Sequence, residues 1–164
     1  MILSEFIDIA VHPQAVWTHL ADPQALAKWH AKLVAVRRDH RGPLFAGERF
    51  GATYVMSPRR PKPADCETEV LQIDPGVQLG FRHHMLVRGS QRYVDETYQL
   101  VPNDDKTATR VHLSVNLAGA GLPLWVRPLV WCIARTGHTQ GEQILEPLKR
   151  ACESGGGANR SGPP

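Results

Sequence analysis

Three residues that could move a proton or bind an oxygen atom share the apolar faces of two neighbouring predicted strands. The segment 91–101 alternates with a period of two, which places Glu96 and Tyr98 on its apolar face. The preceding segment, 77–88, places His83 on its own apolar face. A carboxylate among aliphatic side chains is costly unless it is paired. We therefore expect His83 to be the partner of Glu96.

This trio allows three interpretations. His83 or Glu96 could be the base and Tyr98 the acid in an aldol cyclisation or a dehydration. The same groups could instead bind the carbonyl or phenol of a ligand without any reaction. Alternatively, His83 and Glu96 form a solvated pair at the mouth of a pocket. The catalytic interpretation fails if both side chains point to bulk solvent.

The sequence offers no pattern for a metal or a disulfide framework. Adjacent strand residues point to opposite faces, so His83 and His84 do not form a chelating pair. Cys66, Cys132 and Cys152 are far apart and contain no CxxC spacing. We expect no metal and no cofactor, with thiols that stay reduced as in the cytoplasm.

The composition indicates one globular domain. The 164 residues are 42% hydrophobic and 21% charged, and no stretch reaches the roughly 20 apolar residues that span a membrane. The first residues alternate and carry acidic side chains, which favours a strand over a secretory signal and predicts a cytoplasmic protein. The net charge of +3 is weak evidence for nucleic acid, which we do not expect as a partner. We expect a domain over residues 1–153 and a disordered tail over 154–164.

A first strand and two short helices open the chain. Residues 2–11 alternate, and Pro13 then suits the first turn of a helix. Asp22 followed by Pro23 provides a capping carboxylate and a second helix start. Trp17 is predicted to be a core residue. Trp29, at the end of the second helix, is predicted either in the core or in the wall of a pocket.

Six strand-like segments follow, separated by short turns rich in Gly, Pro, Asn and Asp. They cover residues 32–40, 48–57, 66–74, 77–88, 91–101 and 108–117. Connections this short require antiparallel pairing, so the segments form a meander. In the last strand the inward set is Val111, Leu113, Val115 and Leu117. Its partner, the segment 91–101, has the inward set Val94, Glu96, Tyr98 and Leu100. The next segment, 77–88, has the inward set Leu79, Phe81, His83, Met85 and Val87.

The last segment has the spacing of a long helix over about 123–153. A helix of that length would be roughly 45 Å long, enough to cross the sheet. Pro128 and Pro147 must kink or interrupt it. Gly137 and Gly141 continue its inward stripe, which either lets the helix approach the sheet closely or leaves room for a ligand.

Four phrases carry a resemblance to a known superfamily. They are FIDIAVHPQAVWTHLADPQALAKWH, IDPGVQLGF, YQLVPNDDKTATRV and ILEPLKRACE. Together with the order of elements, they resemble the START-like (SRPBCC) superfamily over about residues 2–153, including bacterial polyketide cyclase/dehydrase-like and lipid-transport proteins. The resemblance implies an α+β helix-grip fold, in which a curved seven-stranded antiparallel sheet with two short helices after strand 1 closes over a long C-terminal helix.

The resemblance also implies a cavity between the sheet and that helix. The expected ligand is a hydrophobic small molecule, such as a lipid, polyketide or aromatic metabolite. The expected ligand-binding residues are Trp29, Tyr54, Phe81, His83, Met85, Glu96, Tyr98, Leu113, Ile133 and Gly137. The alternatives are a cyclase/dehydrase-type enzyme using His83, Glu96 and Tyr98, and a protein-interaction module like the chaperone-activator branch. A filled core would favour the last of these.

Two surface features complete the expectations. The basic loop from Arg59 to Lys62 is predicted as an exposed hairpin loop, with an anion or membrane-surface contact as the alternative. Trp125 and Trp131 could cap the sheet, line the cavity entrance or, if exposed, serve a dimer. We expect a monomer or a homodimer.

Overall fold

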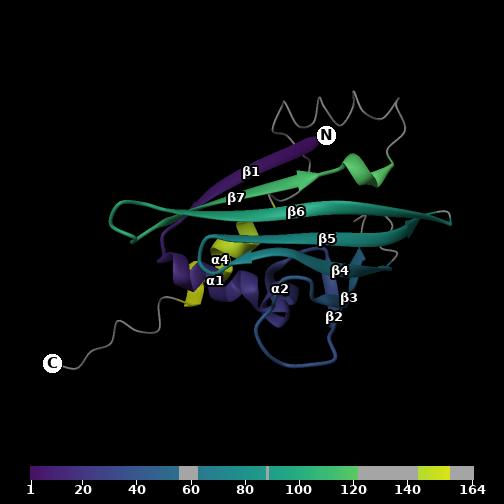
Figure 1. The fold of residues 1–164 in the computed structure, drawn as a ribbon. Helices are drawn as coiled ribbons and strands as arrows, with labels where there is room; N and C mark the ends of the chain where they lie inside the picture. The colour runs from purple at the N-terminus through teal and green to yellow at the C-terminus, as the bar shows by residue number, and fades with distance from the viewer. Residues whose placement is uncertain (56–62, 88, 122–143, 156–164) are drawn as a thin grey trace.

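The computed structural model describes residues 1–55, 63–87, 89–121 and 144–155. In these ranges seven strands form one antiparallel sheet in the order β1-β7-β6-β5-β4-β3-β2. Their bounds are β1 (Ile2–Ile9), β2 (Leu33–Arg37), β3 (Arg49–Val55), β4 (Pro63–Asp74), β5 (Gln78–Val87), β6 (Ser90–Pro102) and β7 (Thr109–Asn116). The helices α1 (Pro13–Ala21), α2 (Pro23–Trp29) and α4 (Glu146–Gly155) lie on one face of this sheet (Figure 1).

The predicted fold class is confirmed. Each predicted strand is present, and its ends differ from the expected ones by three residues or fewer. The turn between β4 and β5 shows why the meander is antiparallel: Val77 N donates to Asp74 O at 3.0 Å, and Gly76 takes a φ of +75° that glycine adopts without strain. Irregular pairing between Leu33 and Ala35, and between Val70 and Gln72, marks bulges of the kind that bend a sheet.

Both short helices begin at a proline that follows a capping side chain. The Asp22 carboxylate accepts from Gln24 N at 2.9 Å, as the Asp-Pro spacing predicts. His12 fills the same role for α1, because its Nδ1 accepts from Gln14 N at 3.1 Å. Trp17 is buried on the inner side of α1, which confirms it as a core residue.

The expected long helix is seen in its last part. Residues 144 and 145 form a turn, and α4 begins at Glu146, so Pro147 lies in the first turn, where a missing N–H breaks no hydrogen bond. The rest of that expectation lies outside the described residues, including Trp125, Pro128, Trp131, Ile133, Gly137 and Gly141. The basic loop from Arg59 to Lys62 and most of the expected tail lie outside them too.

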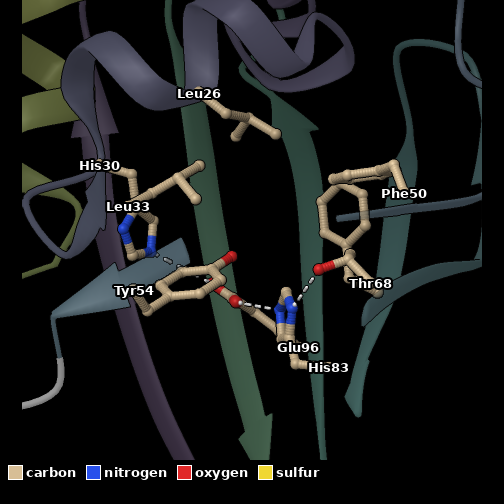
Figure 2. A pocket seen from close by; sticks show the side chains of 9 residues that line it. Leu26, His30, Leu33, Phe50, Tyr54, Thr68, His83 and Glu96 are labelled. Carbon is tan, nitrogen blue, oxygen red and sulfur yellow. Dashed lines mark hydrogen bonds and ion pairs between the residues drawn. The ribbon is translucent and has the colours of Figure 1, made fainter. Parts of the chain in front are cut away.

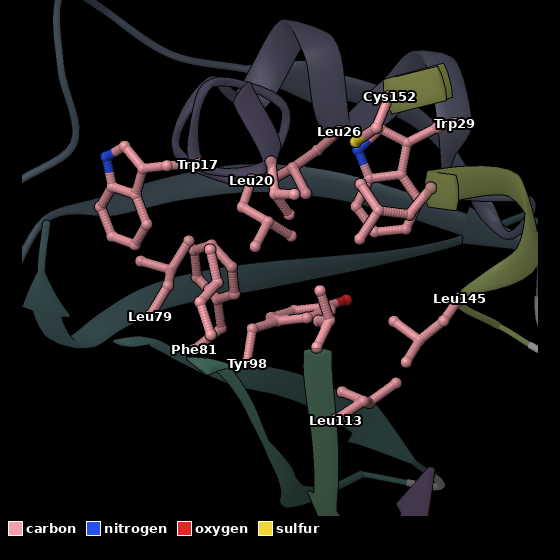
Figure 3. Close-up of a cluster of buried hydrophobic side chains, with 14 of the residues drawn as sticks. Trp17, Leu20, Leu26, Trp29, Leu79, Phe81, Tyr98, Leu113, Leu145 and Cys152 are labelled. Carbon is pink, nitrogen blue, oxygen red and sulfur yellow. The ribbon is translucent and has the colours of Figure 1, made fainter. Parts of the chain in front are cut away.

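The core fills the space between the inner face of the sheet and the helices. Side chains from α1 and α2, such as Leu20 and Trp29, meet Leu79 and Tyr98 from the sheet (Figure 3). α4 and the turn before it close one side of this core with Leu145 from the turn and Leu148 and Cys152 from the helix, all of which are buried. In the final strand Val111 and Leu113 point inward, as the alternation predicts.

The outer face of the sheet carries paired charges beside exposed aromatic side chains such as Phe6 and Tyr93. Arg110 donates to both Asp8 carboxylate oxygens at 2.7 and 2.8 Å, and Arg82 does the same with Asp95 at 2.7 and 3.0 Å. The Asp8–Arg110 pair is exposed and the Arg82–Asp95 pair is partly exposed, and ion pairs at a surface add little stability. Among the helices of the described ranges, none is both long and apolar enough to cross a membrane.

Glu5 of β1 accepts two backbone hydrogen bonds that connect the start of α4 to the sheet. Its carboxylate oxygens accept from Ile144 N and Leu145 N, each at 3.3 Å, and Leu145 O accepts the first bond of the helix from Lys149 N. A carboxylate at this end also complements the helix dipole.

We expect Glu5→Ala to lower the free energy of unfolding by about 1 kcal/mol, the usual cost of losing a helix cap. The measurement is urea unfolding, with hydrogen exchange of the α4 amides as a local readout. Glu5→Gln keeps an acceptor oxygen and should lose less. If the hydrogen exchange of the α4 amides is the same in Glu5→Ala and the wild type, Glu5 does not stabilise the start of α4.

Candidate functional site

A buried cluster of polar side chains occupies the inner face of β5 and β6. β5 and β6 are neighbouring antiparallel strands, with Phe81 opposite Glu96 and His83 opposite Val94. This register brings His83 Nε2 to 3.0 Å from Glu96 Oε2 (Figure 2). The predicted pairing of the histidine with the carboxylate is therefore present.

The pair is shielded from solvent. The His83 side chain is 9% exposed and the Glu96 side chain 12% exposed. The interpretation as a solvated pair at a pocket mouth is therefore wrong. The pair is shielded because α2 and the start of β2 cover this part of the inner face. The alternation of a strand does not show which helix will lie over it.

Each charge stabilises the other. Burial opposes the protonated form of His83, but the Cys66 sulfur and the Glu96 carboxylate together outweigh it and raise the pKa of His83 to about 9. Burial alone would raise the pKa of Glu96, but hydrogen bonds from His83 and Tyr98 and the charge of His83 lower it to about 2. The cluster thus holds a buried imidazolium and a carboxylate at neutral pH.

Tyr98 completes the predicted trio. Its hydroxyl donates to Glu96 Oε1, and its ring is buried edge-on against Trp29, with 6.3 Å between the ring centroids. Burial and the neighbouring Glu96 charge raise the pKa of Tyr98 well above its usual value. Tyr98 is therefore a phenol that donates a hydrogen bond and keeps its proton.

Thr68 of β4 contacts the other nitrogen of His83. Thr68 Oγ1 lies 3.0 Å from His83 Nδ1, and both residues are buried. A hydroxyl can accept from a protonated imidazole or donate to a neutral one. Thr68 can therefore satisfy His83 in either charge state, which is what a group that gains and loses a proton requires.

His30 and Tyr54 bring two more polar side chains to the cluster. His30 Nε2 lies 4.0 Å from Glu96 Oε1, and the Tyr54 ring stacks edge-on against both His30 and His83 at centroid distances of 5.7 and 5.4 Å. Burial lowers the pKa of His30 and raises the pKa of Tyr54 far above its usual value. Both side chains are therefore neutral at pH 7.

These side chains line a small pocket. Its lining consists of Leu26, His30, Leu33, Phe50, Tyr54, Thr68, Phe81, His83 and Glu96 (Figure 2). The volume is about 10 Å³, close to the space that one water molecule needs. A mostly apolar lining with a few convergent polar groups is typical of a small-molecule site, whereas this volume is far below that of an open ligand cavity.

The expected ligand-binding residues divide into three groups. Tyr54, Phe81, His83 and Glu96 line this pocket. Trp29, Met85, Tyr98 and Leu113 are not in its lining; Trp29, Tyr98 and Leu113 are in the core, and Met85 is half-buried toward the end of β5. Ile133 and Gly137 lie outside the described residues.

Sequence reasoning missed two polar residues of the pocket, His30 and Thr68. Thr68 shares the inward face of β4 with Val70, so strand alternation could have found it. His30 follows the last residue of α2, where the helical period no longer applies. Within the described ranges no three His, Cys, Asp or Glu side chains are arranged to hold a metal ion.

Solved structures share this fold at low sequence identity. The chain matches CV1439 of Chromobacterium violaceum with a TM-score of 0.65 and 17% identity, and the match covers 93% of this chain and 96% of that chain. It matches Ms6760 of Mycobacterium smegmatis with a TM-score of 0.65 and 16% identity, and that match covers 94% of this chain and 92% of the other. It also matches DynU16, a protein of the dynemicin biosynthetic locus, with a TM-score of 0.61 and 18% identity. That match covers 94% of this chain and 48% of DynU16, so the chain spans about half the length of DynU16. A comparison with curated proteins gives no match.

The family comparison covers almost the whole chain. Residues 2–153 match the family described as polyketide cyclase / dehydrase and lipid transport. The span agrees with the predicted resemblance, and the solved structures agree with the helix-grip arrangement of sheet and helices. The chain therefore belongs to the polyketide cyclase/dehydrase and lipid transport family.

Proposed function

We propose that the protein binds a hydrophobic small molecule, such as a lipid, a polyketide or an aromatic metabolite, between the sheet and the helices. The observation that carries this proposal is the buried hydrogen-bonded cluster of His83, Glu96 and Tyr98 in an apolar lining. A buried ion pair is not required for stability, because apolar side chains of similar volume often serve as well. Strongly shifted pKa values in a pocket are typical of functional sites.

The small pocket volume sets a condition on this function. About 10 Å³ accommodates one water, so a larger ligand must displace side chains. Leu26, His30 and Leu33 come from the segment of α2 and the start of β2, which covers the cluster. We infer that this segment moves away from the sheet when the ligand enters, and that the polar cluster receives the polar end of the ligand.

The second candidate is an enzyme of cyclase or dehydrase type. The continuous contacts from Thr68 through His83 and Glu96 to Tyr98 favour it, because they join a group that can change protonation state to a phenol donor. The sequence predicts His83 or Glu96 as the base and Tyr98 as the acid. Because burial raises the pKa of Tyr98, the imidazolium of His83 is the better acid in this candidate, and its neutral form is the base. An enzyme would convert the bound molecule, whereas a carrier would release it unchanged.

A protein-interaction module of the chaperone-activator type remains the third candidate, and the small volume of the pocket among the described residues is the observation on its side. The remaining predictions concern the surroundings of the protein rather than its site. We predict a cytoplasmic monomer or homodimer that uses no cofactor and no metal and does not bind nucleic acid.

The test of the binding function is native mass spectrometry of the protein purified from its own host. We expect an added mass on the wild-type chain that is released by an organic solvent and then identified by its fragments. The matched control is Phe81→Trp, which fills the pocket from β5 and should reduce the retained mass without removing a polar group. A chain that carries no added mass under mild conditions contradicts the binding function and leaves the interaction module.

A further inference from the structure

His30 is held in one orientation and one tautomer. Its backbone N–H donates to Leu26 O at 2.8 Å, and its carbonyl accepts from Leu33 N at 3.0 Å. The side-chain Nδ1 accepts from Lys32 N at 3.3 Å. An imidazole nitrogen that accepts a backbone N–H carries no proton, so the proton of neutral His30 is on Nε2.

The Nε2–H group of His30 points into the pocket without a hydrogen-bond acceptor. Glu96 Oε1 is 4.0 Å away, which is beyond hydrogen-bonding distance, and no other acceptor in the described part of the chain bonds to this nitrogen. The His30 side chain is only 10% exposed, and it lines the pocket. This donor is slightly accessible from the pocket and has no protein acceptor within hydrogen-bonding distance in the described part of the chain, so an acceptor from a ligand would be favourable here.

Glu96 Oε1 has room for one more donor. It accepts from the Tyr98 hydroxyl, and a carboxylate oxygen has more than one lone pair. The other oxygen, Oε2, is used by His83. The space between His30 and Glu96 therefore presents one donor and one acceptor that face each other.

We propose that this space binds a hydroxyl group of the ligand, either a phenol, an enol or an alcohol. Its oxygen accepts from His30 Nε2–H, and its proton is donated to Glu96 Oε1. The proposal rests on the binding function proposed above and names the ligand class. His30 and Glu96 are then the residues that determine specificity.

Other polar groups fit this space less well. A carbonyl or ether oxygen accepts from His30 but faces the Glu96 carboxylate with a second negative dipole. An N–H group donates to Glu96 but meets the N–H of His30. A hydroxyl both accepts and donates through one oxygen atom, as the single water for which this pocket has room would do. Tyr54 from β3 and His83 from β5 line this space, and Tyr98 from β6 contacts Glu96 outside the lining. None of the three brings a further negative charge.

The test uses three probes of nearly equal shape: 2-naphthol, 2-methoxynaphthalene and 2-methylnaphthalene. The first both donates and accepts, the second only accepts, and the third does neither. Binding to the wild-type protein is measured by isothermal titration calorimetry at pH 7. We expect 2-naphthol to bind about tenfold more tightly than either of the other two, the effect of one buried polar contact.

The matched variants are His30→Phe, which keeps the ring without the donor, and His30→Gln, which keeps a donor. His30→Phe should bring the three affinities within about twofold of one another, and His30→Gln should restore part of the preference. Circular dichroism and retained binding of 2-methylnaphthalene show that each variant is folded. A wild-type protein that binds all three probes equally, or a preference that survives in His30→Phe, overturns the hydroxyl site and leaves the binding function standing. A wild-type protein that binds none of the probes contradicts the binding function itself, and the hydroxyl site with it.

Discussion

Glu96→Ala is expected to lower the free energy of unfolding by about 3 kcal/mol at pH 6, because it leaves His83 buried without its counter-charge. His83 Nε2 and the Tyr98 hydroxyl both lose their acceptor in this variant. Urea unfolding followed by tryptophan fluorescence gives the value. The matched control is Glu67→Ala on β4, whose side chain is 53% exposed in a pair with Arg49, and which should unfold almost as the wild type does.

A triple variant separates stability from function. Replacing His83 by Leu, Glu96 by Met and Tyr98 by Phe removes the charges together with the groups that depend on them. Because well-packed apolar residues replace buried ion pairs at little or no cost, we expect this variant to be at least as stable as Glu96→Ala and close to the wild type. A triple variant much less stable than Glu96→Ala would mean that the cluster is needed for folding, which would remove the main support for a binding site.

The sequence predicts this fold well because its signals are local. Asp22 with Pro23 starts a helix, the alternation around Leu113 sets the inward face, and the turn at Gly76 forces antiparallel pairing, each within a few residues. Sheet order and curvature follow from these choices and from the bulge after Val70. The predicted strand ends therefore differ from the observed ones by only a few residues.

The site is predicted only where strand alternation reaches it. The pairing of His83 with Glu96 follows from two adjacent strands that share an inward face, and the structure has it at 3.0 Å. Their burial, and the contribution of His30, depend on how α2 packs over the sheet. That packing brings together residues that are far apart in the chain. Neither the two-residue period of a strand nor the 3.6-residue period of a helix encodes it. The size of the pocket has the same origin, because it depends on how Leu26 and Leu33 fill it.

Stability should be highest near pH 6.5 and should fall on both sides. Between about pH 4.5 and 6.5 the ion pair keeps its full contribution, but burial lowers the pKa of His30, so the unfolded chain takes up a proton there first and stability declines below 6.5. Glu96 has an ordinary pKa of 4.5 and a folded pKa of about 2, so its contribution is present above 4.5 and is lost as the pH falls toward 2. His83 has an ordinary pKa of 6.5 and a folded pKa of about 9, so its contribution is present below 6.5 and is lost as the pH rises toward 9. Each arm amounts to about 3 kcal/mol, and both arms report the same ion pair, so they are not added.

Urea unfolding midpoints between pH 3 and pH 9 measure this profile, and Glu96→Gln is the matched variant because it keeps the shape without the charge. In Glu96→Gln the pKa of His83 should fall, because burial is then opposed by Cys66 alone, so the fall in stability above pH 6.5 should shrink. Below pH 6.5 the variant should lose stability, because His83 binds a proton in the unfolded chain but stays neutral in the folded chain. Tyr54 and Tyr98 have raised pKa values and His30 a lowered one, so none of the three produces a loss between pH 6.5 and 9. Identical alkaline arms in the two proteins would show that His83 and Glu96 do not hold each other in the charged state.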